Sequence, residues 1–508
     1  MDHFNKSSHK TFSIPLIRLQ GTKASKNGDK TILFNPGGPG GSGIGLIRGA
    51  GGRFNQMLGE NYNLMSFDPR GVNATIPKAS CYGTAEQRAE ELVNLPFDLE
   101  YEAWKMYAKA ENGAKACDDT MGEHGWYINT PQTAADMNSI LDAIGQEKMY
   151  YWGGSYGTTL GQTYAQMFPE RVARLVIDGV SNLDEWYNSF VFEEWLEDTD
   201  KVFYGFIEEC YKAGKRCPLN SVKKNGFKAA SELQTFIDNF LDNLEKAPIP
   251  VYLNNTHYGA ITRQGLVANG IFPSLYMPLA WPFLASNLAE LLKGNTEPAF
   301  LAYSSSWLGH ILTDETNNFV IANDNWNTGV KAPVHGLQPV QNFTRAIPQQ
   351  SKLVSKYRGF DIYRRASWSI PTTHNFHPHY YPAYPKVKTA EPILVVSLTW
   401  DLVCPLASAK KAFASFEGAG FVEQKSYGHC STSMPSLCTA KHVRRYFDEG
   451  VLPEKGATCG VDGEYFPGPD GSSLTELSEE DAELLEALEG LAAQPIFKPL
   501  SPAGSLFV

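Results

Sequence analysis

Residues 149–158 read MYYWGGSYGT, and this stretch decides the fold. Its apolar first half predicts a strand, and the residues from Thr158 to Met167 predict a helix. Ser155 lies at the turn between them, with a glycine two residues before it and another two residues after it. A serine on such a tight strand–turn–helix segment is held above the edge of a sheet, beside the N–H groups of a helix N-terminus. We therefore predict that Ser155 is a nucleophile; the alternative is a glycine-rich turn with an incidental serine.

A glycine-rich loop, NPGGPGGSG at residues 35–43, follows another predicted strand at residues 31–35. An oxyanion hole needs a main-chain N–H group close to the reacting carbonyl, and glycine lets the main chain approach it. The prolines of the loop have no N–H group, so we expect Gly38 to donate, with Gly37 as the alternative. The N–H group of Tyr156 would be the second donor. A phosphate-binding loop is the rival interpretation, but the lysine that normally ends such a loop is missing.

Two further residues complete a catalytic pattern near the other end of the chain. Asp401 follows an apolar stretch at residues 393–398, and His429 follows the next predicted strand. The order serine, aspartate, histidine is that of α/β-hydrolase triads. In such a triad His429 would take the proton of Ser155, and Asp401 would hold the imidazole in the correct tautomer.

Strand and helix patterns divide the chain into four parts. Residues 1–181 alternate strands with helices, which predicts a mostly parallel sheet with helices on both faces. Together with the triad order, we interpret this segment as the first part of an α/β-hydrolase core. Residues 182–385 are helical and aromatic, and we interpret them as a large helical cap inserted into the core. Residues 386–460 restore the core. Residues 461–508 are predicted to be a tail with one acidic helix.

Composition excludes several classes of partner. The chain has 508 residues, of which 44 are basic and 55 acidic, giving a formal net charge of −11. This balance argues against nucleic acid, and no apolar run approaches the ~20 residues of a membrane span. We expect a peptide or small-molecule substrate and neither a cofactor nor a metal. One histidine cluster, His374, His377 and His379, is interpreted as part of an aromatic loop, with a metal site as the alternative. The sequence does not indicate the oligomeric state.

Two more segments help to identify the family that the chain resembles: DPRG at residues 68–71 and YFDEGVLP at residues 446–453. Together with the glycine loop and the Ser155 turn, they resemble tripeptidyl aminopeptidase-like α/β-hydrolases, relatives of the proline iminopeptidases. The resemblance covers about residues 10–465. It implies a serine hydrolase that cleaves an amide bond through an acyl-enzyme, as an exopeptidase that removes short peptides from free N-termini.

Substrate preference is expected to come from the cap. An acidic stretch at its start offers Glu193, Glu194 and Glu197 as partners for a substrate's ammonium group, and a solvated helix face is the alternative. The second function considered is hydrolysis of an ester, lactone or amide of a small, partly apolar metabolite. Aromatic residues of the cap would then shape the pocket: Trp186, Trp195, Tyr276, Trp281, Trp307 and Trp326.

The eight cysteines indicate whether the protein is secreted or cytoplasmic. The family resemblance implies a disulfide between Cys438 and Cys459, with Cys81–Cys117 and Cys210–Cys217 as further candidates. Cys404 and Cys430 each lie next to a predicted triad residue in the sequence, and they are candidates to pair with each other. Disulfides favour a secreted protein. The first residues, however, contain no apolar signal segment. We expect that residues are missing before Met1; the alternative is a cytoplasmic protein with reduced thiols.

Overall fold

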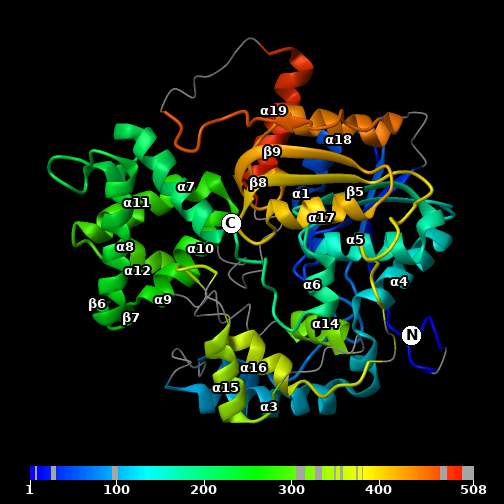
Figure 1. Cartoon of the computed structure of the whole chain (residues 1–508), viewed down its shortest axis with the longest axis horizontal. Coiled ribbons are helices and arrows are strands. Elements are labelled where there is room, and N and C mark those ends of the chain that lie inside the picture. Colours follow the sequence, from blue (N-terminus) through cyan, green and yellow to red (C-terminus); the bar gives the residue numbers. More distant parts are fainter. Residues whose placement is uncertain are drawn as a thin grey trace.

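The computed structural model describes residues 1–5, 8–23, 30–93, 101–304, 315–326, 334–347, 350–354, 359–372, 374, 376–379, 382–468 and 477–494. Within this part of the chain, eight strands form one sheet in the order β1-β3-β2-β4-β5-β8-β9-β10 (Figure 1). All neighbouring strands are parallel except β1, which is antiparallel to β3. The strands are β1 Leu16–Leu19, β2 Thr31–Asn35, β3 Asn63–Phe67, β4 Met149–Gly154, β5 Val172–Asp178, β8 Leu394–Asp401, β9 Gly420–Gly428 and β10 Thr458–Cys459.

The sheet is parallel because its central strands are buried on both faces. Every residue of β2 and β4 is buried, and their side chains alternate between two apolar clusters. Ile32 and Trp152 contribute to one cluster, and Leu33 and Tyr151 contribute to the other. Continuous apolar strands of this kind need helices on both faces. This arrangement confirms the predicted α/β-hydrolase fold.

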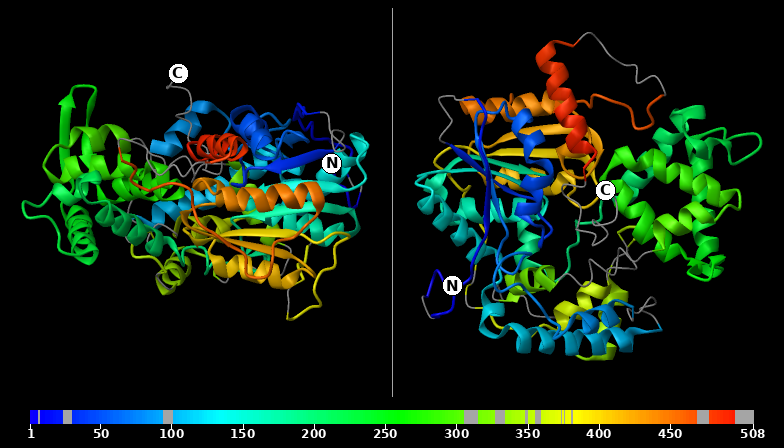
Figure 2. Two further views of the ribbon diagram at one scale, coloured as in Figure 1. Left: turned by 90° about the horizontal axis from the view of Figure 1, so that it is seen from above. Right: turned by 180° about the vertical axis from the view of Figure 1, so that it is seen from behind.

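Six helices cover the two faces (Figures 1 and 2). One face carries α1 Gly43–Met57, α18 Leu437–Glu449 and α19 Glu479–Ala492; the other carries α4 Thr130–Ala143, α5 Tyr156–Met167 and α17 Leu406–Ser415. Ser478 is the N-cap of helix α19, and its hydroxyl accepts a hydrogen bond from the Asp481 N–H at 3.2 Å. Leu484, Leu488 and Leu491 of this helix are buried in the same cluster as the sheet. The predicted acidic helix therefore exists, but it packs as part of the core.

The cap consists of two helical groups, which Figure 1 shows beside and below the sheet. The first comprises α7 Thr199–Lys212, α8 Ala230–Lys246, α9 Arg263–Gly265, α10 Phe272–Tyr276, α11 Trp281–Leu292, α12 Glu297–Tyr303 and a hairpin of β6 Ile249–Asn254 and β7 His257–Ile261. The second comprises α14 Glu315–Trp326, α15 Leu337–Ala346 and α16 Gly359–Ser367. None of the described helices has the length and apolarity needed to cross a membrane.

Two features of the cap differ from the expectation. The hairpin was not anticipated in a helical cap, although Tyr252 and Leu253 alternate between exposed and half-buried positions as in a strand with one packed face. Helix α3, Ala103–Met121, lies within the predicted core segment but packs against α15 and α16 through Met106 and Tyr363. Helix α2, Ala85–Val93, precedes it. The cap is therefore built from both sides of the residue 181 boundary.

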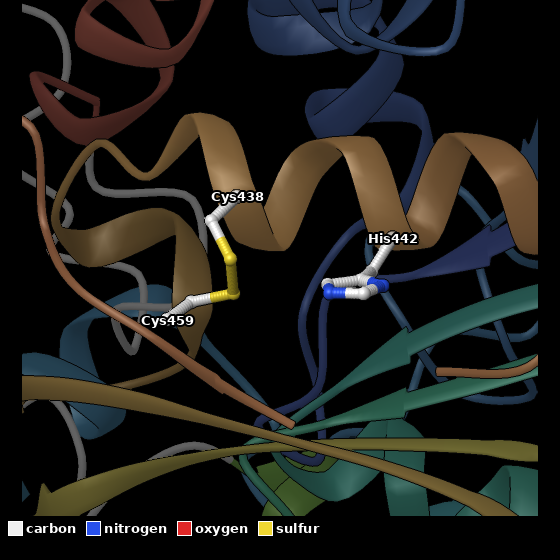
Figure 3. A group of neighbouring side chains, drawn as sticks. All are labelled: Cys438, His442 and Cys459. Carbon is white, nitrogen blue, oxygen red and sulfur yellow. A yellow bond between two sulfur atoms is a disulfide. The ribbon is translucent and has the colours of Figure 1, made fainter. Parts of the chain in front are cut away.

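Three disulfides form in the described residues: Cys81–Cys117, Cys210–Cys217 and Cys438–Cys459. Figure 3 shows the last of these beside His442; its two sulfurs are bonded to each other, so they are not free thiolates for a metal. The proposed pairing of Cys404 with Cys430 is wrong, because both are free and buried. The Cys430 thiol instead turns toward β5 and donates to the Asp178 carbonyl oxygen at 3.3 Å.

Candidate active site

Ser155 occupies a strained turn between β4 and α5. Its backbone has φ +56° and ψ −127°, a conformation that non-glycine residues rarely adopt. A Cβ atom on Gly157 would lie 2.7 Å from the carbonyl oxygen of Asn35, so only glycine fits there. The Ser155 N–H donates to the Asp178 carbonyl oxygen at 3.0 Å and fixes the turn against β5. This is the geometry that the motif predicted.

The glycine loop lies directly against this turn. Gly37 and Gly38 have φ of +88° and +111°, and a Cβ atom on Gly37 would lie 2.6 Å from the Gly154 carbonyl oxygen. The N–H of Gly37 already donates to Asn35 Oδ1 at 2.9 Å. Of the two candidate donors in the loop, Gly38 is therefore the one whose N–H is not held by Asn35.

We predict that Gly37→Ala lowers kcat/KM by about 100-fold or more, because the new methyl group would displace the Ser155 turn by a fraction of an ångström. Steady-state kinetics on a fluorogenic substrate measure this effect. Gly52→Ala is the matched control, since a Cβ atom there meets nothing within 4 Å. Equal activity in both variants would contradict the prediction.

Asp401 and His429 are paired at the ends of β8 and β9. His429 Nδ1 lies 2.9 Å from each of the two carboxylate oxygens of Asp401, which is fully buried. Three main-chain N–H groups also donate to this carboxylate at 2.9–3.1 Å, those of Val403, Cys404 and Cys430. The Tyr276 ring from the cap meets the imidazole edge-on at 5.1 Å. These contacts fix the carboxylate and the orientation of the ring.

His429 Nε2, the nitrogen that would accept a proton, is buried and has no hydrogen-bond partner among the described residues. Ser155 and His429 follow the carboxyl ends of parallel strands, which meet at the same edge of a sheet. A serine hydroxyl, an imidazole and a buried carboxylate at one edge can support acyl transfer. Contacts between serine and histidine are often long before substrate binds.

A cap residue that the sequence did not single out, Asp324 of α14, anchors Tyr156. Its carboxylate accepts from the Thr130 N–H at 2.7 Å, the Thr130 hydroxyl at 2.6 Å and the Trp186 ring N–H at 2.7 Å. Thr130 Oγ in turn lies 2.6 Å from the Tyr156 hydroxyl. Burial raises the pKa of Asp324 to about 6, although the bonds from Thr130 and Trp186 lower it. The cap thus holds the residue that follows Ser155.

The three glutamates proposed for substrate binding have other surroundings. Glu194 forms an ion pair with Lys411 and accepts from Ser408 Oγ at 3.0 Å, so it ties the start of the cap to α17. Glu197 lies 3.7 Å from Lys201, and Glu193 is exposed. Of the aromatic residues named for the cap, Trp307 and the side chain of Trp326 lie outside the described residues. Trp281 is buried in the first cap group.

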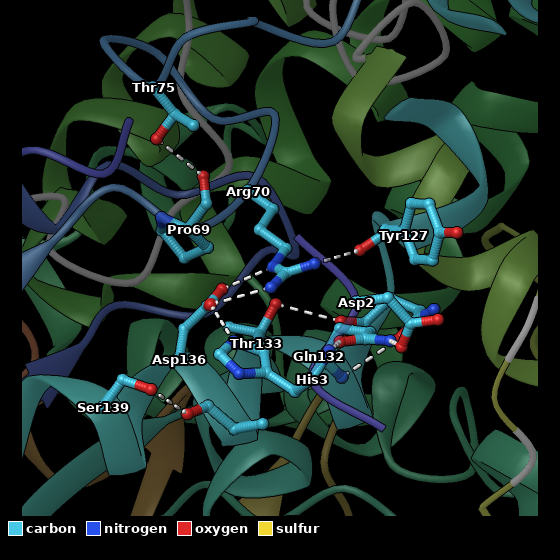
Figure 4. A network of polar contacts seen from close by, with 12 residues as sticks. Asp2, His3, Pro69, Arg70, Thr75, Tyr127, Gln132, Thr133, Asp136 and Ser139 are labelled. Atoms are coloured by element: carbon cyan, nitrogen blue, oxygen red, sulfur yellow. Dashed lines mark hydrogen bonds and ion pairs between the residues drawn. The ribbon is translucent and has the colours of Figure 1, made fainter. Parts of the chain in front are cut away.

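The DPRG segment braces the glycine loop and α1. Asp68 Oδ1 accepts from the Ser42 hydroxyl at 2.6 Å, and Ser42 is the N-cap of α1. Arg70 forms a buried two-pronged ion pair with Asp136 of α4, at 2.5 and 2.8 Å (Figure 4). His3 Nε2 lies 2.7 Å from the same carboxylate. These residues support the site without reaching it.

Comparison with known proteins decides the family. A family model described as an alpha/beta hydrolase fold matches residues 30–221, and one described as a TAP-like protein matches residues 364–459. The chain belongs to the TAP-like α/β-hydrolases. Each match contains predicted triad positions of this TAP-like hydrolase, Ser155 in the first and Asp401 and His429 in the second.

Three relatives show how far the similarity of the TAP-like hydrolase extends. Serine protease Hip1 of Mycobacterium tuberculosis is 28% identical over 464 residues, covering 88% of this chain and 83% of the relative. Tripeptidyl aminopeptidase of Streptomyces lividans is 34% identical over 199 residues, covering 38% and 35%. Carboxylesterase B of M. tuberculosis is 25% identical over 447 residues, covering 84% and 79%. The TAP-like hydrolase is a serine hydrolase.

Proposed function

We propose that this serine hydrolase cleaves peptide bonds through an acyl-enzyme formed on Ser155. His429 takes the hydroxyl proton as Ser155 attacks the carbonyl carbon, and then protonates the leaving amine. Asp401 holds the tautomer in which Nδ1 is protonated and stabilises the imidazolium. The N–H groups of Gly38 and Tyr156 bind the oxyanion. The observation that carries the proposal is the buried pair of Asp401 and His429, 2.9 Å apart. Among the described residues, no group bonds to Nε2 of this histidine.

The substrate class is proposed to be peptides with a free N-terminus. Two relatives support this choice by their names, a serine protease and a tripeptidyl aminopeptidase. An exopeptidase of this kind needs a carboxylate that binds the ammonium group of the substrate. Glu194 is a poor candidate, because Lys411 and Ser408 already engage its carboxylate. Glu193 and Glu197, which are both exposed, remain the candidates among the three glutamates.

A second candidate function is hydrolysis of small esters. It rests on the similarity to Carboxylesterase B and on the aromatic cap residues that reach the triad region. The Tyr276 ring contacts the His429 ring at 5.1 Å, and the Trp186 ring contacts the Tyr156 ring at 5.3 Å. Such apolar rings favour a partly apolar acyl group.

A comparison of three substrates distinguishes these functions. We predict that a tripeptide amide of aminomethylcoumarin with a free N-terminus has a kcat/KM at least ~30-fold above that of its N-acetylated form, because a desolvated ion pair contributes about 2 kcal/mol or more. A p-nitrophenyl butyrate ester is the third substrate. Equal cleavage of the free and acetylated peptides would overturn the exopeptidase proposal. An ester kcat/KM above both peptides would favour the second function.

A further inference from the structure

A second buried carboxylate, which the acyl-transfer mechanism does not use, lies beneath the proposed triad. Asp178 ends β5 and is fully buried. Its carboxylate accepts two hydrogen bonds from Ser431, one from the main-chain N–H at 2.8 Å and one from the hydroxyl at 2.6 Å. Its main-chain carbonyl oxygen accepts the N–H of Ser155 at 3.0 Å. One residue therefore contacts both the nucleophile turn and the segment that follows His429.

The segment around His429 is strained and needs such support. Gly428 has φ +133°, and Cys430 has φ +62° although it is not a glycine. A non-glycine residue in this region costs of order 1–3 kcal/mol and persists only where its surroundings hold it. The Asp401 carboxylate holds this segment at Cys430, whose N–H it accepts at 3.0 Å. Asp178 holds it through the next residue, Ser431.

The charge of Asp178 also acts on the site. Burial raises its pKa to about 6, while the bonds from Ser431 and the nearness of His429 lower it, so the carboxylate is mostly ionised at neutral pH. Four titratable groups face it, those of Asp401, His429, Cys404 and Cys430. A second negative charge near His429 favours the imidazolium that forms when the imidazole takes the serine proton.

We propose that Asp178 is a positioning residue for the reaction. Its side chain clamps the strained segment that carries His429, and its main chain fixes Ser155, so the spacing of nucleophile and base is set through β5. The inference rests on the proposed roles of Ser155 and His429.

Two variants separate charge from geometry. Asp178→Asn keeps the shape and can still accept the Ser431 N–H, but it removes the charge. We expect kcat to fall about 30- to 100-fold with KM little changed, since a charge-assisted hydrogen bond is lost. The acid limb of the kcat–pH profile should move to lower pH, because a negative charge near His429 is removed. Ser431→Ala keeps the carboxylate, so kcat at neutral pH should fall only about fivefold. Because the lost hydroxyl bond lowered the pKa of Asp178, the acid limb should not move down as it does in Asp178→Asn.

The readouts are kcat and its pH profile on the best substrate. Circular dichroism measures the folded fraction of each variant, and fluorophosphonate labelling reports the reactivity of Ser155. Wild-type kcat and pH profile in Asp178→Asn would overturn the inference, as would a loss fully explained by unfolded protein. If Asp178→Asn does not fold, an unchanged kcat in Ser431→Ala overturns it. Failure of the proposed function is distinguishable, because wild-type protein would then show no labelling that depends on Ser155.

Discussion

Ser155→Ala is expected to lower kcat by about 10⁴- to 10⁶-fold, the loss seen when a triad nucleophile is removed. The reason is that no other group can form the acyl-enzyme, whereas the oxyanion hole and substrate binding remain. The variant should stay folded, since the Ser155 hydroxyl accounts for none of the hydrogen bonds that hold the turn. Turnover of the tripeptide substrate and labelling by a fluorophosphonate probe measure the effect.

The companion variants test whether the three residues act as a unit. His429→Ala should lose about as much activity as Ser155→Ala, and the double variant should lose little more, because each change disables the same step. Asp401→Asn should lose about 10⁴-fold, since it favours the wrong tautomer of His429. Ser139→Ala on α4 is the matched control and should keep full activity and labelling. Labelling that survives in Ser155→Ala would show that another residue is the nucleophile.

The core could be predicted from the sequence because its strands are buried on both faces. Residues 149–152 and 393–398 are almost continuously apolar, so they do not resemble the mixed apolar and polar pattern of a surface helix. The cap could not be predicted in the same detail. In its hairpin, Tyr252 and Tyr258 are 73% and 66% exposed. Large apolar residues in these strands therefore do not indicate which face of the hairpin is buried.

The candidate site likewise contains some residues that the sequence could predict and others that it could not. The predicted positions of Ser155, Asp401 and His429 depend on local motifs at strand ends, although their roles remain a prediction. Asp324 has no motif: it meets Thr130 across a sequence separation of 194 residues, and only the packing of the cap brings them together. For Asp178 the sequence gives only a weak indication of a role: it ends the strand that pairs with the strand before Ser155.

The largest effect on stability is expected from Arg70→Met. The Arg70 side chain is 2% exposed, and its guanidinium pairs with Asp136, whose side chain is 8% exposed (Figure 4). Removing Arg70 leaves the buried Asp136 carboxylate with only the partly exposed His3 close to it, which should lower the free energy of unfolding by about 3–5 kcal/mol. Arg171→Met provides the matched control: its partner Asp142 is 64% exposed, so the change should be below about 1 kcal/mol. Urea unfolding of both variants measures the difference.

The pH dependence identifies the buried charge as the cause. Burial alone would raise the pKa of Asp136, but the charge and hydrogen bonds of Arg70, with a contribution from His3, hold it below its ordinary value. The pair therefore contributes stability that is present above the unfolded pKa of about 3.9 and is lost as pH falls through the lower folded pKa. In Arg70→Met the pKa of Asp136 should rise instead, because burial then outweighs the contribution of His3, and acid neutralises the carboxylate in the folded state.

The deficit of Arg70→Met relative to the wild type should thus be largest near neutral pH and shrink below about pH 5. The double variant Arg70→Met/Asp136→Leu removes both charges and should be more stable than Arg70→Met alone at neutral pH. A deficit that stays constant with pH, and that the second substitution does not relieve, would mean that lost packing of the Arg70 side chain against Phe12 is responsible instead of charge.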